Sequence, residues 1–133
     1  MADDVIYDWN ELPPNHRQTP RVEIHDETLR DGIQCPSVFD PPIEVKAEAV
    51  RLMARVGVDS VNVGLPGAGP RAVEDSEHLV RVIRDEKLPI RPSCAARTHP
   101  NDIRPVIEIS ERTGVPVEPM MFLGTSPIRM YAE

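Results

Sequence analysis

Residues 21–34 read RVEIHDETLRDGIQ. The alternating apolar residues at the start of this stretch, which follow a polar loop, predict a β-strand over about 21–28. Arg30, Asp31 and Gly32 then come where that strand ends. Because α/β folds present their chemistry at the carboxyl ends of their strands, the stretch predicts such a fold with a charged site at this end.

Helical and extended patterns alternate along the rest of the chain. The spacing of apolar residues predicts helices over about 45–56, 71–86 and 101–113, and further strands over 60–63, 89–96 and 115–123. The strand starts lie roughly 30–40 residues apart, which is the size of one strand-and-helix unit. Strands that alternate with amphipathic helices form parallel sheets with right-handed crossovers. A further helix should begin just before Glu133.

The same periodicity predicts which helical residues point toward the core. They are Val45, Ala49, Leu52, Met53 and Val56 in the first helix, Val73, Leu79, Val80 and Ile83 in the second, and Ile103, Val106, Ile107 and Ile109 in the third. Lys46, Glu48 and Arg51 should lie on the outer face of the first helix. Gly57 and Gly114 should end the first and third helices.

Polar and glycine-rich segments connect these elements. Asn101 can cap the third helix, with Pro105 in its first turn, where a missing N–H matters least. Gly64, Gly67 and Gly69 are spaced unlike either a dinucleotide fingerprint or a P-loop, so they predict a flexible loop.

Two architectures fit the alternating pattern. One is an open doubly wound sheet, and the other is half of an eight-stranded β/α barrel, which as a whole needs about 250 residues. Composition does not separate the two. The length of 133 residues predicts one domain over 21–133, preceded by a polar, irregular arm over 1–20 that carries Tyr7 and Trp9.

Composition limits the partners and the compartment. A net charge of -7 and a pI near 5.1 argue against nucleic acid and membrane surfaces as partners. No segment approaches the roughly 18 apolar residues of a membrane span, and the N-terminus has no apolar signal core. Two isolated cysteines, Cys35 and Cys94, form neither a CxxC pair nor a disulfide framework, so we expect a reduced, cytoplasmic chain. Cys94 should be buried in its strand.

The charged residues after the first strand allow two interpretations. Asp31 suits a hard divalent metal as an oxygen ligand, and Arg30 can polarise a carbonyl or hold an enolate. Equally, the two residues can form a surface ion pair beside the Gly32 turn. Asn62 is either a residue facing the interior of a barrel or an ordinary strand residue. His99 is expected to be a solvated loop residue.

The resemblance to a known family lies in four segments. Residues 26–34, DETLRDGIQ, resemble the D-x-T-L-R-D-G-x-Q signature of the 2-isopropylmalate synthase and homocitrate synthase family, in the metal-dependent barrel group that includes hydroxymethylglutaryl-CoA lyase. Residues 61–66 (VNVGLP) resemble its I-E-x-G-F-P strand, and residues 122–128 (FLGTSPI) resemble its F-I-A-T-S-P-I strand. Residues 94–97 (CAAR) are similar to the end of its third strand.

This resemblance implies a fold and a reaction. The fold would be α/β, a partial (β/α)8 TIM barrel with about the first four strands and three helices. The reaction would be a Claisen-type condensation of acetyl-CoA with a 2-oxo acid in amino-acid biosynthesis of the leucine type. The family also tends to dimerise, so a homodimer is possible.

The resemblance also implies roles for single residues. Arg30 matches the catalytic arginine, and Asp31 matches a ligand of a divalent metal ion, either Mg, Mn or Zn. The expected substrate-binding residues are Gln34, Asn62, Arg97, Thr125 and Ser126. Thr125 and Ser126 are equally suited to binding a carboxylate and to capping the next helix.

Three departures from the family pattern limit what the chain should do alone. Asn62 stands where the family usually has glutamate, and Arg129 stands where the synthases often have histidine. The H-x-H metal ligands of the family come from a late strand that the sequence does not contain. We therefore expect an N-terminal fragment that is inactive by itself. The alternatives are a metal-dependent carbon–carbon lyase or aldolase of the same group, or a non-catalytic scaffold.

Overall fold

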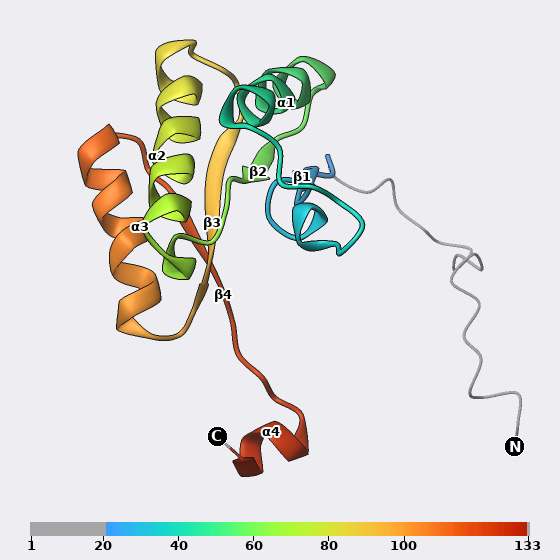
Figure 1. The fold of residues 1–133 in the computed structure, drawn as a ribbon, viewed down its shortest axis with the longest axis vertical. Coiled ribbons are helices and arrows are strands. Elements are labelled where there is room, and N and C mark those ends of the chain that lie inside the picture. Colours follow the sequence, from blue (N-terminus) through green and yellow to red (C-terminus); the bar gives the residue numbers. More distant parts are fainter. Residues whose placement is uncertain (1–20, 133) are drawn as a thin grey trace, which may run out of the picture.

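The computed structural model describes residues 21–132, so the expected arm over residues 1–20 lies outside the described part. Four parallel strands form one sheet in the order β1-β2-β3-β4 (Figure 1). Their bounds are His25–Asp26 for β1, Ser60–Asn62 for β2, Arg91–Arg97 for β3 and Glu118–Phe122 for β4. The strands therefore follow one another across the sheet in sequence order.

Helices connect consecutive strands. The α-helices are α1 (Ile43–Val56), α2 (Pro70–Asp85), α3 (Pro100–Thr113) and α4 (Pro127–Ala132), and two 3-10 turns are η1 (Gly32–Gln34) and η2 (Pro66–Ala68). A doubly wound sheet reverses its strand order at a switch point, whereas a barrel adds each strand beside the one before. The unreversed order confirms the α/β fold expected from the sequence and selects the partial β/α barrel.

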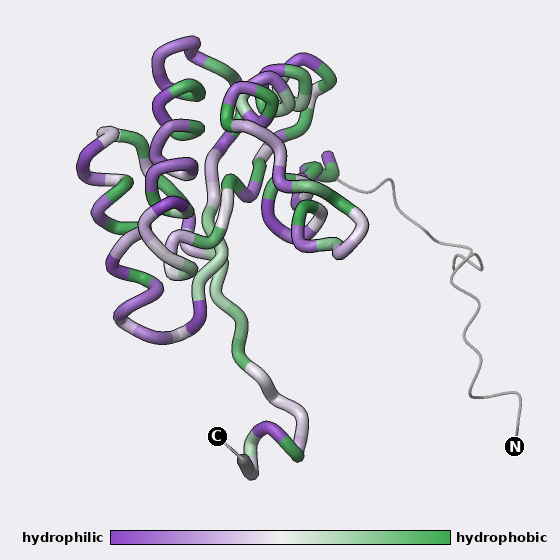
Figure 2. Tube along the Cα trace, viewed as in Figure 1, coloured by the Kyte–Doolittle hydropathy of each residue, from purple (hydrophilic) through white to green (hydrophobic). Residues whose placement is uncertain are grey.

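The core lies between the sheet and the helices α1, α2 and α3. Strand residues Val61 and Cys94 pack in one cluster with Val50, Leu79 and Ile109. Hydrophilic and hydrophobic residues alternate around α2 and α3 in Figure 2, as expected of amphipathic helices. Burial raises the pKa of the Cys94 thiol to about 12, which makes this cysteine an inert core residue, as the sequence predicted.

The prediction for the inner face of α1 was wrong for three of its five residues, whereas Ala49 and Met53 are partly buried against the core, as expected. Val45, Leu52 and Val56 are exposed, and the last has 79% of its surface accessible. The small residues Ala47 and Ala54 are buried instead, together with Val50 and Lys46. Lys46 was expected outside but is buried, because carboxylates from other parts of the chain meet its ammonium group.

The third helix also differs from expectation in detail. Its N-cap is His99, whose Nδ1 accepts a hydrogen bond from the Asn101 N–H at 3.2 Å. Pro100 occupies the first helical position, so Pro105 lies inside the helix and not in its first turn. Ile107 was predicted to point inward but is 49% exposed, whereas Val106 and Ile109 are buried.

The C-terminal ends of α1 and α3 were predicted correctly, whereas two of the strands were predicted too long. Gly57 and Gly114 end α1 and α3 in the left-handed conformation, as expected. Strands β1 and β4 are shorter than predicted. The chain before β4 is held by Ser110, whose Oγ donates to the Val115 carbonyl at 2.7 Å and accepts from the Val117 N–H at 3.1 Å.

The glycine-rich segment after β2 is closely packed, which differs from the flexible loop that was expected. A methyl group on Gly67 would lie 2.8 Å from Asp102 Cγ, and one on Gly64 would lie 2.7 Å from Ser76 Oγ. Gly69 has a φ of 143°, which side chains rarely adopt. Close approach to α2 and α3 therefore requires glycine here. Within residues 21–132, no helix is long and apolar enough to cross a membrane.

Candidate active site

The chain closes into a tight turn directly after β1. The N–H groups of Arg30, Asp31 and Gly32 all donate to the Glu27 carbonyl, at 3.1, 2.9 and 3.1 Å. This turn explains why β1 is short, because the backbone leaves the sheet at Glu27. It also places the side chains of Arg30 and Asp31 at the carboxyl end of the strand, where barrel enzymes carry their reacting groups.

The carboxylate of Glu27 contacts three side chains at this end. Its Oε1 lies 2.9 Å from His25 Nε2 and accepts a hydrogen bond from Asn62 Nδ2 at 3.2 Å. Its Oε2 accepts from Arg30 Nε at 3.1 Å. The other ring nitrogen of His25 lies 2.8 Å from Ser60 Oγ on β2. The ends of β1 and β2 are thus joined through one partly buried carboxylate.

Arg30 also contacts Asp31. Its Nη1 donates to Asp31 Oδ1 at 3.1 Å, so the surface pair foreseen as one alternative is present. The guanidinium is nevertheless held on two sides, by Asp31 and by Glu27. An arginine fixed in this way keeps its charge at any physiological pH and presents a defined set of N–H donors.

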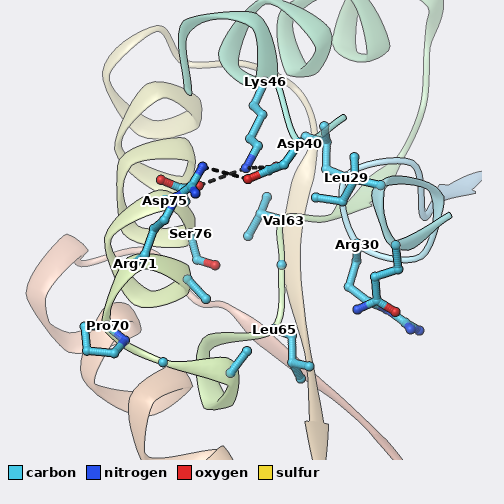
Figure 3. A pocket seen from close by; sticks show the side chains of 16 residues that line it. Leu29, Arg30, Asp40, Lys46, Val63, Leu65, Pro70, Arg71, Asp75 and Ser76 are labelled. Atoms are coloured by element: carbon cyan, nitrogen blue, oxygen red, sulfur yellow. Dashed lines mark hydrogen bonds and ion pairs between the residues drawn. The ribbon is translucent and has the colours of Figure 1, made fainter. Parts of the chain in front are cut away.

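A cavity of about 440 Å³ lies beside Arg30, between α1, α2 and the ends of β1 and β2 (Figure 3). Arg30 and Gln34 both line it, and much of the remaining wall is apolar, including Leu29, Val63 and Leu65. Two of the predicted site residues therefore share one cavity. An apolar cavity with a few convergent polar groups is the usual form of a small-molecule site.

Lys46 forms the charged wall of this cavity opposite Arg30 in Figure 3. Its Nζ lies 2.7 Å from Asp40 Oδ1 and 2.8 Å from Asp75 Oδ2. Burial opposes the positive charge, but the hydrogen bonds to the two carboxylates outweigh it and hold the pKa of Lys46 above its ordinary value. Arg71 binds the second oxygen of Asp40 at 2.7 Å.

The other predicted site residues lie elsewhere at the carboxyl ends of the strands. Arg97 ends β3, where Asp102 accepts from its Nε at 2.7 Å and from its Nη2 at 2.9 Å. Thr125 and Ser126 follow β4 and are exposed. Ser126 Oγ accepts from the Arg129 N–H at 3.3 Å, so capping of α4 is one role that Ser126 has. None of these three residues lines the cavity beside Arg30.

The expected metal ligand Asp31 has no cluster of further ligands around it in the described residues. Within residues 21–132 there is no group of three or more His, Cys, Asp or Glu side chains that could hold a metal ion. Asp31 is well exposed, and one of its oxygens is bound to Arg30. As a lone carboxylate it offers oxygen atoms of the kind that a divalent metal prefers, and its role as a ligand stays a prediction.

Sequence reasoning missed His25, Glu27 and the ion-paired Lys46. His25 and Glu27 have the two-residue spacing that places side chains on one face of a strand, which was the available signal. The partners of Lys46 could not be inferred, because Asp75 lies 29 residues away in the chain.

Parallel strands in sequence order, with charged residues and a cavity at their carboxyl ends, define a β/α-barrel protein of the kind that carries enzyme sites. The chain belongs to the HMGL-like family, whose model matches residues 21–132. This agrees with the family relationship that the motifs indicated.

Several relatives in this family are 2-isopropylmalate synthases. The chain is 35% identical to that of Halothermothrix orenii over 109 residues, which are 82% of this chain and 20% of the relative. It is 35% identical to that of Heliobacterium modesticaldum over 111 residues, or 83% and 20%. It is 33% identical to that of Nitrobacter winogradskyi over 118 residues, or 89% and 22%. The chain thus spans about a fifth of the length of these relatives.

Proposed function

We propose that residues 21–133 are the first half of the catalytic barrel of an acyl-CoA-dependent synthase that resembles 2-isopropylmalate synthase. The reaction would condense acetyl-CoA with a 2-oxo acid, as part of amino-acid biosynthesis of the leucine type. The observation that supports this most is Arg30, held at the end of β1 by Glu27 and Asp31 beside a cavity that Gln34 also lines.

The chemistry requires a fixed positive charge at the oxygen of the ketone. The methyl carbon of the acetyl group loses a proton and forms a bond with the keto carbon, while the π electrons of the carbonyl move to its oxygen. The resulting alkoxide takes up a proton, and water then cleaves the thioester to release CoA. Arg30 would stabilise the alkoxide through charge-assisted hydrogen bonds, which is commonly the largest catalytic contribution.

The other site residues would bind and orient the substrate. Gln34 lines the cavity and can bond to the carboxylate of the oxo acid. Arg97, Thr125 and Ser126 would complete the substrate site from the ends of β3 and β4. Asn62, whose amide donates a hydrogen bond to Glu27, would support the substrate site from β2.

A divalent metal, Mg, Mn or Zn, would polarise the oxo acid, with Asp31 as one ligand and the others from residues outside the described range. The free thiols of Cys35 and Cys94 fit a cytoplasmic protein. We also propose that the protein forms a homodimer.

The proposal can be tested by transplanting the segment. Residues 21–132 replace the matching segment in the 2-isopropylmalate synthase of Halothermothrix orenii, and release of free CoA from acetyl-CoA is measured with and without a 2-oxo acid. We expect oxo-acid-dependent release from the chimera and none from its Arg30→Ala variant. A chimera that folds like its parent but releases no CoA would contradict the proposal.

A further inference from the structure

Glu27 is the most highly connected side chain of the site, yet the proposed reaction gives it no role. It accepts hydrogen bonds from residues of both β1 and β2, and all of its partners lie within 3.2 Å. Asn62, one of these partners, is completely buried. A carboxylate held by so many donors has a defined position, so it can in turn define the position of Arg30.

The way in which Glu27 holds Arg30 leaves part of the guanidinium for a ligand. Glu27 takes the Nε–H, and Asp31 takes one hydrogen of Nη1. Within residues 21–132 the Arg30 side chain has no further hydrogen bond or ion pair, so the Nη2 group keeps both of its donors. If Asp31 turned toward another ligand, Glu27 alone would fix the guanidinium. The bond to Nε restrains the last rotatable bonds of the side chain, since Nε is the atom next to the planar group.

The partner Asn62 connects this arrangement to the second strand. Asn62 is completely buried on β2, and its amide donates to Glu27 Oε1 at 3.2 Å. Glu27 itself lies in the turn that follows β1. The carboxylate that holds Arg30 is therefore fixed in turn by a buried side chain.

We propose that Glu27, in the turn that follows β1, is the positioning residue of Arg30. This inference rests on the proposed role of Arg30 in binding a 2-oxo acid and deepens it. Glu27 acts through Arg30 and does not touch substrate.

The test follows the order of the Arg30 side chain directly. The isosteric change Glu27→Gln keeps the shape of the side chain and removes its charge. The readout is the Nε–H resonance of Arg30 in the purified chain, with its ¹⁵N heteronuclear NOE. We expect the NOE to be as high as that of ordered backbone in the wild type, and to fall in Glu27→Gln to the value of Arg55, which is exposed on α1. An unchanged NOE in the variant would overturn the proposal.

A matched control separates this effect from a general loss of charge. Glu23→Gln removes the partner of Arg91 in an exposed ion pair. It should leave the Arg30 resonance unchanged. A fall in the Arg30 NOE as large as that in Glu27→Gln would overturn the assignment to Glu27.

A second variant tests the role of the negative charge. Glu27→Asp keeps the carboxylate in the turn that follows β1 and should retain an ordered Arg30. A loss of the Arg30 NOE in this variant as large as that in Glu27→Gln would contradict the role of the charge.

The same samples separate this inference from the proposed function. Titration with a 2-oxo acid should give an apparent Kd about tenfold weaker in Glu27→Gln, as expected when a charge-assisted hydrogen bond no longer fixes the arginine. If the wild type binds no oxo acid while its Arg30 order still depends on Glu27, the proposed function fails and the positioning role stands.

Discussion

Lys46 Nζ on α1 lies 2.8 Å from Asp75 Oδ2 on α2, although both helices pack their inner faces against an apolar core. Asp40, in the loop before α1, holds the same ammonium group at 2.7 Å. The three residues join two helices and a loop around the cavity beside Arg30. The loop that follows the Arg30 turn is therefore anchored by a buried charge.

Replacing Lys46 by methionine should destabilise the protein. Removing one partner of a buried ion pair costs roughly 3–5 kcal/mol, and the partial exposure of both aspartates lowers our expectation to about 2 kcal/mol. Urea denaturation measures the free energy of unfolding. Arg71→Gln, which removes an exposed cation from the same Asp40, is the matched control and should cost under about 1 kcal/mol. Equal stabilities for the two variants would refute the structural role of Lys46.

Gly67 should not tolerate a side chain. An alanine methyl group at this position would lie 2.8 Å from Asp102 Cγ, so Gly67→Ala should lower the free energy of unfolding by about 1–3 kcal/mol. Gly32→Ala is the control, because its methyl group would meet Thr28 Cγ2 at an ordinary 3.7 Å. Thermal unfolding of both variants measures the difference. A Gly67→Ala protein as stable as Gly32→Ala would contradict the close packing of Gly67 against Asp102.

Asp102 should contribute to the fall in the free energy of unfolding at acidic pH. Hydrogen bonds from the Arg97 side chain and backbone N–H lower the pKa of Asp102 to about 2. The folded-state pKa of Asp102 lies below the unfolded value of about 3.9. The contribution of Asp102 to the free energy of unfolding is therefore complete above about pH 3.9 and is lost as the pH falls toward 2.

Asp102→Asn should therefore lose less stability than the wild type between about pH 4 and pH 2. Urea denaturation at several pH values in this range gives the two slopes. Parallel slopes would mean that Asp102 has an ordinary pKa in the folded protein.

Divalent metal should bind the purified chain only weakly. Residues 21–132 offer Asp31 but no cluster of three ligands. Titration with Mn²⁺, followed by the loss of its free EPR signal, should show no tight stoichiometric site, and Asp31→Asn should weaken the residual binding. The same preparation should release no CoA from acetyl-CoA with a 2-oxo acid. Tight binding that survives Asp31→Asn would contradict the assignment of this ligand.

Local signals predicted the order of the elements and several of their ends. The apolar periodicity of α2 identified Leu79, Val80 and Ile83 as core residues, and Gly57 and Gly114 marked helix ends because each adopts a left-handed conformation. These features depend on residues close together in the chain, which a sequence displays directly.

Contacts between distant residues explain what was missed. Lys46 was misassigned to the outer face of α1 because it is buried through its ion pair with Asp75, and the sequence does not show that pairing. The site residues likewise fall into those that the sequence displays and those that depend on contacts between distant residues. Arg30 and Asp31 were found through a contiguous motif, whereas the contact of Glu27 with Asn62 joins residues 35 positions apart.

Arg30 is proposed to bind a 2-oxo acid in the cavity at the end of β1. Titration of the isotopically labelled chain with a 2-oxo acid, followed through the side-chain N–H resonances, tests it most directly. We expect saturable shifts at Arg30 Nε and at the Gln34 amide, with no comparable shifts when the matching 2-hydroxy acid is added. Shifts that are absent from Arg30 and Gln34, or equal for the two acids, would contradict the account.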